Sequence, residues 1–176
     1  MKTDMKPVKK LGRLLLLSVI VIGISGCRMT VSLTGGNINP NATTVYIGTF
    51  TNNASLVNPT LSQELTTALK NRVQNQTPLT IVNTNGDYNL EGEITGYTIS
   101  PIAIQGNETA AMNRLTITIR VSFTNRFDEK DNFEQSFSRY ADYISTLNFT
   151  SVESTLVEQI NEALTDDIFN QAFVNW

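Results

Sequence analysis

The sequence predicts an α+β fold, a two-layer sandwich in which two helices pack on one face of a mostly antiparallel four- to five-stranded sheet. Two segments carry apolar residues at helical spacing, one following an early strand and one near the end of the chain. Between them lie several runs rich in β-branched and aromatic residues, each bounded by turn residues. A strand, a helix, a run of strands and a final helix is an order typical of α+β proteins.

The first strand is expected at residues 43–50, a run of β-branched and aromatic residues. Residues 51–54 read as a loop, after which Asn58 and Pro59 supply a capping residue and a proline for the start of a helix. Apolar residues then recur on one helical face: Leu61, Leu65, Ala68, Leu69 and Val73. Residues 79–82 form a short second strand.

Three long strands follow and should be antiparallel neighbours. In the first, residues 88–100, Gly92 and Gly96 indicate a bulge or a close approach of another element. The second alternates most regularly, with apolar residues at Leu115 to Phe123 on one face and polar residues on the other. The third covers residues 133–143.

The last helix is predicted from a capping-box match, Thr150 to Glu153, and is expected to run almost to Trp176. Its apolar residues keep helical spacing: Val152, Leu156, Ile160, Ala163, Leu164, Ile168 and Ala172.

The beginning of the chain has the features of a secretory signal, with basic residues followed by an apolar run from Leu14 to Ile24. The run is shorter than the roughly 20 residues that a membrane-spanning helix needs. It ends in Ile24-Ser25-Gly26-Cys27, which matches a bacterial lipobox, and Cys27 is the sole cysteine. We expect residues 1–26 to be a signal peptide that is removed, 27–42 to be the lipidated cysteine and a flexible tether, and 43–176 to be a single domain.

No acidic residue directly follows Cys27, so the expected location is the outer membrane, with the domain lipid-anchored and facing the periplasm. Removing residues 1–26 takes away five of the 13 basic and one of the 16 acidic residues, which leaves a net charge of about −7. That charge, without a basic cluster, argues against nucleic-acid binding.

Little in the sequence suggests an enzyme, and no cofactor or metal site is expected. The chain has no histidine, which excludes histidine-assisted nucleophiles and histidine-rich zinc sites. Glu91 and Glu93 share a strand face and could serve as paired carboxylates in an envelope hydrolase, but alternating glutamates are also ordinary on a solvated strand.

Two surface features remain. The apolar strip 101–107 is either a buried loop crossing or a partner contact. The polar face of residues 114–126 is either solvated β surface or a site for a phosphorylated glycolipid. Arg114 and Arg120 are the candidate phosphate ligands on that face, because guanidinium groups match phosphate geometry.

The mature chain resembles the lipopolysaccharide-assembly lipoprotein family, LptE, in its divergent, non-enterobacterial branch. The resemblance rests on the lipobox, on residues 45–52 with the helix after them, on 91–97, on 113–125, on 137–143 and on 167–170. It implies a non-enzymatic α/β sandwich that plugs and helps to assemble a large β-barrel partner, LptD, and assists lipopolysaccharide delivery to the outer leaflet.

A second resemblance leads to different partners. Lipoproteins that activate peptidoglycan synthesis or form secretion pores also begin with a strand that ends in Phe-x-Asn, as Phe50-Thr51-Asn52 does, followed by an amphipathic helix. Their sheets usually interleave more helices, whereas this chain places three long strands in succession.

Overall fold

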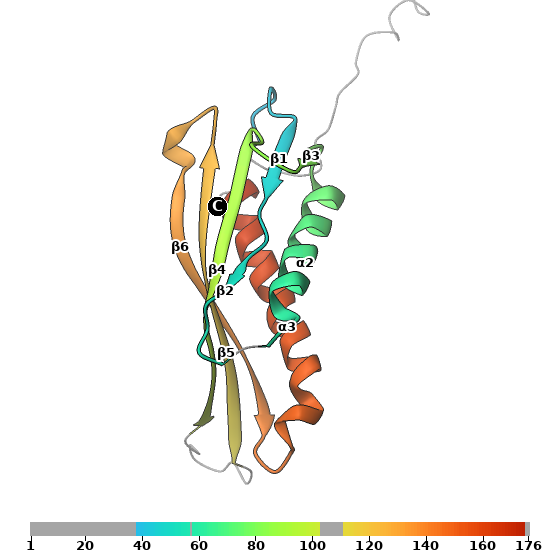
Figure 1. The fold of residues 1–176 in the computed structure, drawn as a ribbon, viewed down its shortest axis with the longest axis vertical. Helices are drawn as coiled ribbons and strands as arrows, with labels where there is room; N and C mark the ends of the chain where they lie inside the picture. The colour runs from blue at the N-terminus through green and yellow to red at the C-terminus, as the bar shows by residue number, and fades with distance from the viewer. Residues whose placement is uncertain (1–37, 57, 103–110, 175–176) are drawn as a thin grey trace, which may run out of the picture. The chain divides into compact units, whose positions relative to one another are not determined.

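A computed structural model describes residues 38–56, 58–102 and 111–174. Six strands form one sheet, with two helices on one of its faces, so the predicted α+β sandwich is confirmed (Figure 1). The strand order is β3-β1-β4-β5-β6. The short β2 follows β1 along β4 and pairs with the next residues of that strand. The predicted signal peptide, Cys27 and most of the tether lie outside the described residues.

The three long strands are β4 (Tyr88–Ile102), β5 (Met112–Asn125) and β6 (Phe133–Ile144), and they are antiparallel, as predicted. The alternation of β5 is as the sequence indicates, since its apolar residues from Leu115 to Phe123 are all buried. The register of β4 against β5 shifts between Ile94 and Gly96, so a bulge does occur next to Gly96, with Thr95 as the extra residue.

Gly92 has a different role, a close approach by an aromatic ring. A Cβ atom at this position would lie 2.4 Å from Cε1 of Phe50 and 2.7 Å from the Arg120 carbonyl oxygen. Phe50 itself is 1% exposed. Glycine is therefore required here for space, because any side chain would overlap the Phe50 ring.

The other strands are β1 (Thr44–Ile47), β2 (Thr51–Asn52) and β3 (Thr80–Val82), and all three pairings in which they take part are parallel. The prediction of a loop from residue 51 was wrong for Thr51 and Asn52, which pair with Glu93 and Ile94 of β4. Gly48 already donates its N–H to the Leu90 carbonyl at 2.9 Å, so the chain stays alongside β4 between β1 and β2.

Helix α2 (Leu61–Gln76) buries Leu61, Leu65, Leu69 and Val73, as the spacing predicts. Pro59 does not occupy the first helical turn, because the helix begins two residues later. The N-cap residue is Thr60, and Asn58 contributes by accepting the N–H groups of Thr60 and Leu61 on its Oδ1 at 3.0 and 3.2 Å.

Helix α3 (Phe149–Phe169) continues into η2 (Asn170–Val174), a π-helical turn. The predicted capping box was wrong, because the N-cap is Asn148, whose Oδ1 accepts the Thr150 N–H at 3.0 Å. Glu153 instead accepts hydrogen bonds from Asn58 Nδ2 at 2.9 Å and from the Tyr97 hydroxyl at 2.7 Å. It therefore joins α3 to β4 and to the start of α2.

The core lies between the sheet and the helices, and aromatic rings fill one end of it. Phe123 stacks on Tyr88 and on Phe133, with ring centroids 5.7 and 5.4 Å apart. Phe173 of η2 meets Tyr88 and Phe123 edge-on. The hydroxyl of Tyr88 also accepts the Asn39 N–H at 2.9 Å, so the chain ahead of β1 contacts the domain.

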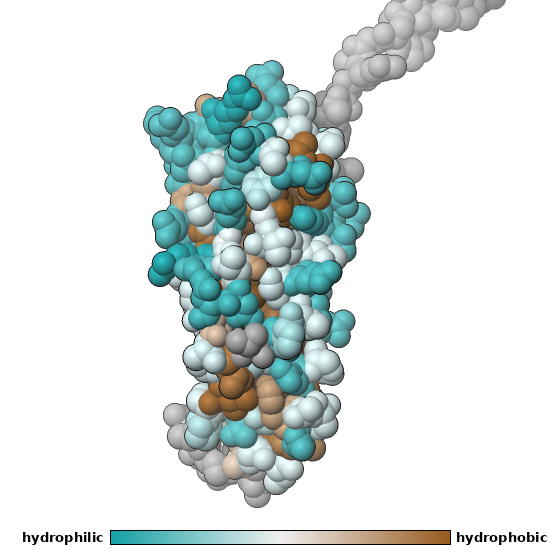
Figure 2. Space-filling model, viewed as in Figure 1, coloured by the Kyte–Doolittle hydropathy of each residue, from teal (hydrophilic) through white to brown (hydrophobic). Residues whose placement is uncertain are grey.

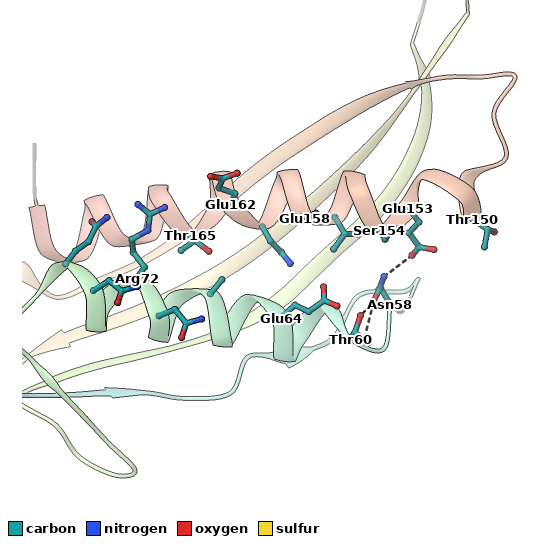
Figure 3. Close-up of a pocket in the computed structure, with 16 residues that line it drawn as sticks. Asn58, Thr60, Glu64, Arg72, Thr150, Glu153, Ser154, Glu158, Glu162 and Thr165 are labelled. Atoms are coloured by element: carbon teal, nitrogen blue, oxygen red, sulfur yellow. Dashed lines mark hydrogen bonds between the residues drawn. The ribbon is translucent and has the colours of Figure 1, made fainter.

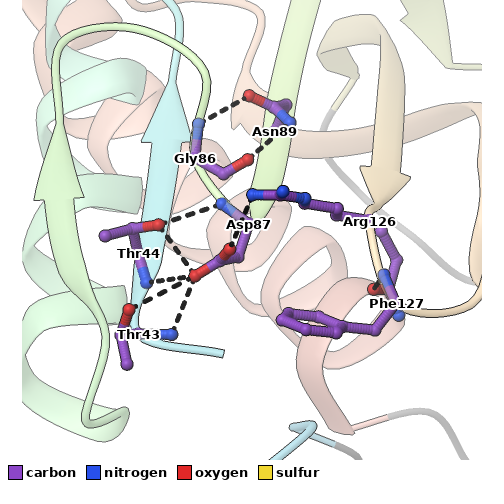
Figure 4. Close-up of polar contacts among 8 residues, drawn as sticks. Thr43, Thr44, Gly86, Asp87, Asn89, Arg126 and Phe127 are labelled. Atoms are coloured by element: carbon purple, nitrogen blue, oxygen red, sulfur yellow. Dashed lines mark hydrogen bonds and ion pairs between the residues drawn. The ribbon is translucent and has the colours of Figure 1, made fainter. Parts of the chain in front are cut away.

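Asp87 fixes the beginning of β1 (Figure 4). Its Oδ2 accepts the N–H groups of Thr43 and Thr44 at 2.9 and 3.1 Å, and the Thr44 hydroxyl at 2.9 Å. These bonds, led by the one from the Thr43 N–H, lower the pKa of the Asp87 carboxyl. The turn before β4 is thus bound to the first residues of β1.

No helix among the described residues is both long enough and apolar enough to cross a membrane.

Candidate functional site

The candidate site is the face of β4, β5 and β6 that is turned away from α2 and α3, here called the outer face. Side chains of β5 alternate across the sheet, so the polar set opposite the core faces outward. Its members are Arg114, Thr116, Thr118, Arg120, Ser122 and Thr124.

Arg114 is held between an acid and an aromatic ring, both on β6. Its Nε and Nη2 donate to the two carboxylate oxygens of Asp142 at 2.7 and 2.9 Å. The guanidinium carbon lies 3.5 Å from the centroid of the Tyr140 ring. The paired bonds from Arg114 lower the pKa of the Asp142 carboxyl. Asp142 and Tyr140 therefore hold the Arg114 guanidinium in one orientation, and the Asp142 carboxylate offsets part of its positive charge.

Arg120 is held less firmly. Its Nη1 lies 3.4 Å from a carboxylate oxygen of Glu93 on β4, and its Nε lies 3.9 Å from Glu134 on β6. About half of its side chain is exposed. Glu93 also accepts a hydrogen bond from Asn53 Nδ2 at 2.7 Å. Arg120 is thus free to move further than Arg114, because exposed ion pairs of this length stabilise a side chain weakly.

The two arginines do not form one cluster. They lie six positions apart on one strand, which at the usual rise separates them by roughly 20 Å. Four carboxylates accompany them on the outer face: Glu91, Glu93, Glu134 and Asp142. The local charge is therefore negative, and a phosphate group would compete with carboxylates for each guanidinium.

Arg114 nevertheless keeps donors for a ligand. A guanidinium carries five N–H donors, and Asp142 takes two of them. Stacking on Tyr140 fixes the plane of the remaining donors, which lowers the entropy cost of an additional hydrogen bond. The geometry allows one oriented contact to an acceptor such as a phosphate oxygen.

An apolar row borders Arg114. The register places Ile102, Met112 and Ile144 side by side across the sheet, two residues beyond Arg114 along β5. Ile144 is 45% exposed. Hydrophobic surface is also visible towards the lower end of the domain in Figure 2. The outer face therefore changes from charged and polar to apolar at the end of the hairpin where β4 ends and β5 begins.

Among the described residues, the structure adds no catalytic residue to the alternative hydrolase site at Glu91 and Glu93. Glu91 and Glu93 do lie on the same face, but Glu93 is engaged by Asn53 and Arg120. Within the ranges described, no group of three or more acidic, histidine or cysteine side chains could hold a metal ion. Of the apolar strip 101–107, Pro101 and Ile102 belong to β4 and the remainder lies outside the described residues.

Sequence reasoning proposed the two arginines as candidates but missed the residues that contact them. Tyr140 and Asp142 lie 26 and 28 positions from Arg114 along the chain. Antiparallel pairing of β5 with β6 could have shown the proximity, had the register been known, because Arg114 pairs with Asp142. The capping-box interpretation of Glu153 likewise concealed its bonds to Asn58 and Tyr97.

Comparison with known proteins gives a family. The sequence profile described as "LptE: Lipopolysaccharide-assembly" matches residues 42–172, well over half of the chain. The chain belongs to the LptE family. LptE proteins are lipoproteins of the outer membrane that act in lipopolysaccharide assembly, and the family name refers to assembly and not to a catalysed reaction.

Solved structures similar to this LptE-family chain include a neuraminyllactose-binding hemagglutinin homologue from Helicobacter pylori. It is 8% identical with a TM-score of 0.50, covering 79% of this chain and 87% of that one. At this identity the likeness shows a shared fold alone.

Two further structures are lipoproteins. The minor lipoprotein of Acinetobacter baumannii is 15% identical with a TM-score of 0.49, covering 74% of this chain and 91% of that one. Rare lipoprotein B of Shewanella oneidensis is 12% identical with a TM-score of 0.47, covering 72% and 89%. Among curated proteins, none matches the chain significantly.

Proposed function

We propose that this protein is an outer-membrane lipoprotein that plugs and helps to assemble an LptD-like β-barrel, and that it assists lipopolysaccharide transport to the outer leaflet. The observation that carries the proposal is the family match over residues 42–172. Residues 1–26 are the signal peptide, lipid on Cys27 is the anchor, residues 27–42 are the tether, and residues 43–176 are the domain that faces the periplasm.

The outer face supports a direct contact with lipopolysaccharide. Its apolar row of Ile102, Met112 and Ile144 suits acyl chains, and Arg114 in the next outward-facing row suits a phosphate. The two groups are about 7 Å apart along β5, because Met112 and Arg114 are separated by two positions. Arg120 serves as a second phosphate contact further along the strand.

The partner is tested by purifying the full-length lipoprotein from its own outer membrane in a mild detergent and identifying co-purifying proteins by mass spectrometry. We expect a large β-barrel in near-equal amount. A Cys27→Ala variant is the control, because it should lose the membrane anchor. Recovery of a peptidoglycan synthase, or of a homo-oligomeric pore without a barrel, would instead support the adaptor and secretion-pore alternative.

The glycolipid contact is tested with the purified protein and lipid A. Reversing both arginines, Arg114→Glu with Arg120→Glu, should weaken binding by roughly tenfold or more, because two guanidinium–phosphate contacts are lost and two carboxylates are added. Lys130→Glu is the charge-reversal control, to be compared with each single arginine reversal as well, since Lys130 lies in η1 (Glu129–Asp131), away from both arginines. Unchanged affinity in the double variant would remove both residues from the site.

A further inference from the structure

Helices α2 and α3 enclose a groove of about 880 Å³ on the side of the domain away from the outer face. Figure 3 shows the side chains that line it, which come from both helices and from the segment before α2. The floor includes the small or apolar residues Ala68 and Val157. None of the contacts described for the outer face involves this groove.

Two polar bridges join the elements that line the groove, one towards each end. At one end, Asn58 Nδ2 donates to Glu153 Oε1 at 2.9 Å (Figure 3). At the other end, Arg72 of α2 forms an ion pair with Asp166 of α3. The thirteen positions between Glu153 and Asp166 correspond to roughly 20 Å of helix. An extended polypeptide of about six residues fits that length.

The rim of the groove is acidic. Glu64, Glu158 and Glu162 line it, and across the described part of the chain no lysine or arginine lies within ion-pair distance of these three carboxylates. Arg72 also lines the groove, but Asp166 neutralises it. The free charge around the groove is therefore negative, which favours a cationic guest.

Two buried polar atoms point to a ligand independently of this charge. Asn161 and Thr165, one turn apart on α3, are 6% and 3% exposed and both line the groove. Within the described structure, Asn161 Oδ1 and Thr165 Oγ1 are covered by protein and have no hydrogen-bond partner, so a guest bonds to them when these side chains turn towards the groove. Thr165 points towards α2 in Figure 3. Leaving such groups unpaired costs free energy, so a guest that bonds to them gains affinity.

We infer that this groove binds an extended, lysine- or arginine-bearing polypeptide segment of a partner protein. Cationic side chains of the segment pair with the rim glutamates, and its N–H groups donate to Asn161 Oδ1 and Thr165 Oγ1. The amide side chains of Asn71 and Asn75, which also line the groove, can both donate and accept, which suits a peptide backbone. This inference goes beyond the proposed function and does not require the partner to be a β-barrel.

The test uses the purified protein and a short capped peptide that alternates lysine with serine, with binding followed by calorimetry. A glutamate–serine peptide of equal length is the control ligand. We expect the lysine peptide to bind and the glutamate peptide not to bind. Neutralising the rim with Glu158→Gln and Glu162→Gln should weaken binding about tenfold, as expected for two lost charge contacts. Glu129→Gln with Glu134→Gln, exposed acids away from the groove, should not change it.

Thr165→Val separates a binding role from a structural one. The substitution is nearly isosteric and removes a hydroxyl that has no partner in the free protein, so the melting temperature should stay the same or rise. Affinity for the lysine peptide should fall about fivefold with the lost hydrogen bond. Absence of binding by the wild-type protein, equal binding of both peptides, or unchanged affinity in Thr165→Val would overturn the inference, whereas the membrane pull-down would be unaffected.

Discussion

Replacing Gly92 by alanine tests how closely Phe50 packs on β4. The new Cβ atom would lie 2.4 Å from Phe50 Cε1, about 1 Å closer than an ordinary carbon contact. The Arg120 carbonyl oxygen, 2.7 Å away, belongs to the paired strand β5 and cannot move independently. Overpacking of a core costs about 1–3 kcal/mol, and with a backbone obstacle we expect a loss near the upper end, about 3 kcal/mol.

The matched control is Gly96→Ala on the same strand. A Cβ atom there would first meet the side chain of Thr118, at 3.3 Å, which can shift slightly. We expect the stability of this variant to lie within about 0.5 kcal/mol of the wild type, because the loss of glycine freedom in the unfolded chain offsets a small strain. Both variants are measured by urea unfolding, which gives the free energy of unfolding and the slope m.

A second substitution identifies the cause of the Gly92 effect. Phe50→Leu removes the ring and should cost about 1.5 kcal/mol alone. Combined with Gly92→Ala, the total loss should be smaller than the sum by about 1–2 kcal/mol, since the overlap is relieved once. If Gly92→Ala were no worse than Gly96→Ala, or if the Phe50 and Gly92 losses were additive, the close approach would not be the reason for glycine at this position.

Two further predictions concern polar groups. Because its hydrogen bonds lower the folded-state pKa of Asp87, this carboxylate stabilises the protein above its ordinary pKa of 3.8, and the contribution is lost as the pH falls through the lower, folded value. The Asp87→Asn variant should therefore be less stable than the wild type at neutral pH, and it should lose less stability between pH 5 and pH 2, the acid range of this linkage. Unfolding titrations at several pH values measure both effects. An unchanged dependence of stability on pH would exclude Asp87 as a contributor. Tyr97→Phe removes the 2.7 Å bond to Glu153 and should lower the free energy of unfolding by about 1–2 kcal/mol, with Tyr140→Phe, an exposed tyrosine, as the neutral control. Equal stability of these two variants would show that Asn58 alone satisfies Glu153.

Much of this fold was predictable because its periodic signals are local. The alternation from Leu115 to Phe123 specifies a strand with one buried face, and the spacing from Leu61 to Val73 specifies a helix whatever surrounds it. The two glycines of β4 were also recognisable as special positions. Which of them adjoins the bulge and which admits a ring depends on Phe50, 42 positions before Gly92, and local sequence carries no such information.

Two of the incorrect predictions share one physical origin, competition from distant residues. Glu153 satisfies a capping-box pattern, but Asn58 and Tyr97, 95 and 56 positions away, engage its carboxylate instead. Thr51 and Asn52 have no strand signal of their own and are extended because β4 offers them an edge. The proposed groove was equally hidden, because Asn161 and Thr165 read as ordinary polar helix residues until α2 covers them.

The arrangement at the beginning of β1 has a mechanical consequence. A pull on the chain ahead of β1 reaches the domain at Asn39, whose N–H donates to the Tyr88 hydroxyl, and then at Thr43 and Thr44, which Asp87 holds with two backbone bonds. Beyond them, β1 is bonded on one side to β3 and on the other to β4. A force along this strand loads both ladders in shear, so their bonds must break together and not one after another. The domain is thus built to stay folded under tension from the anchor proposed at Cys27.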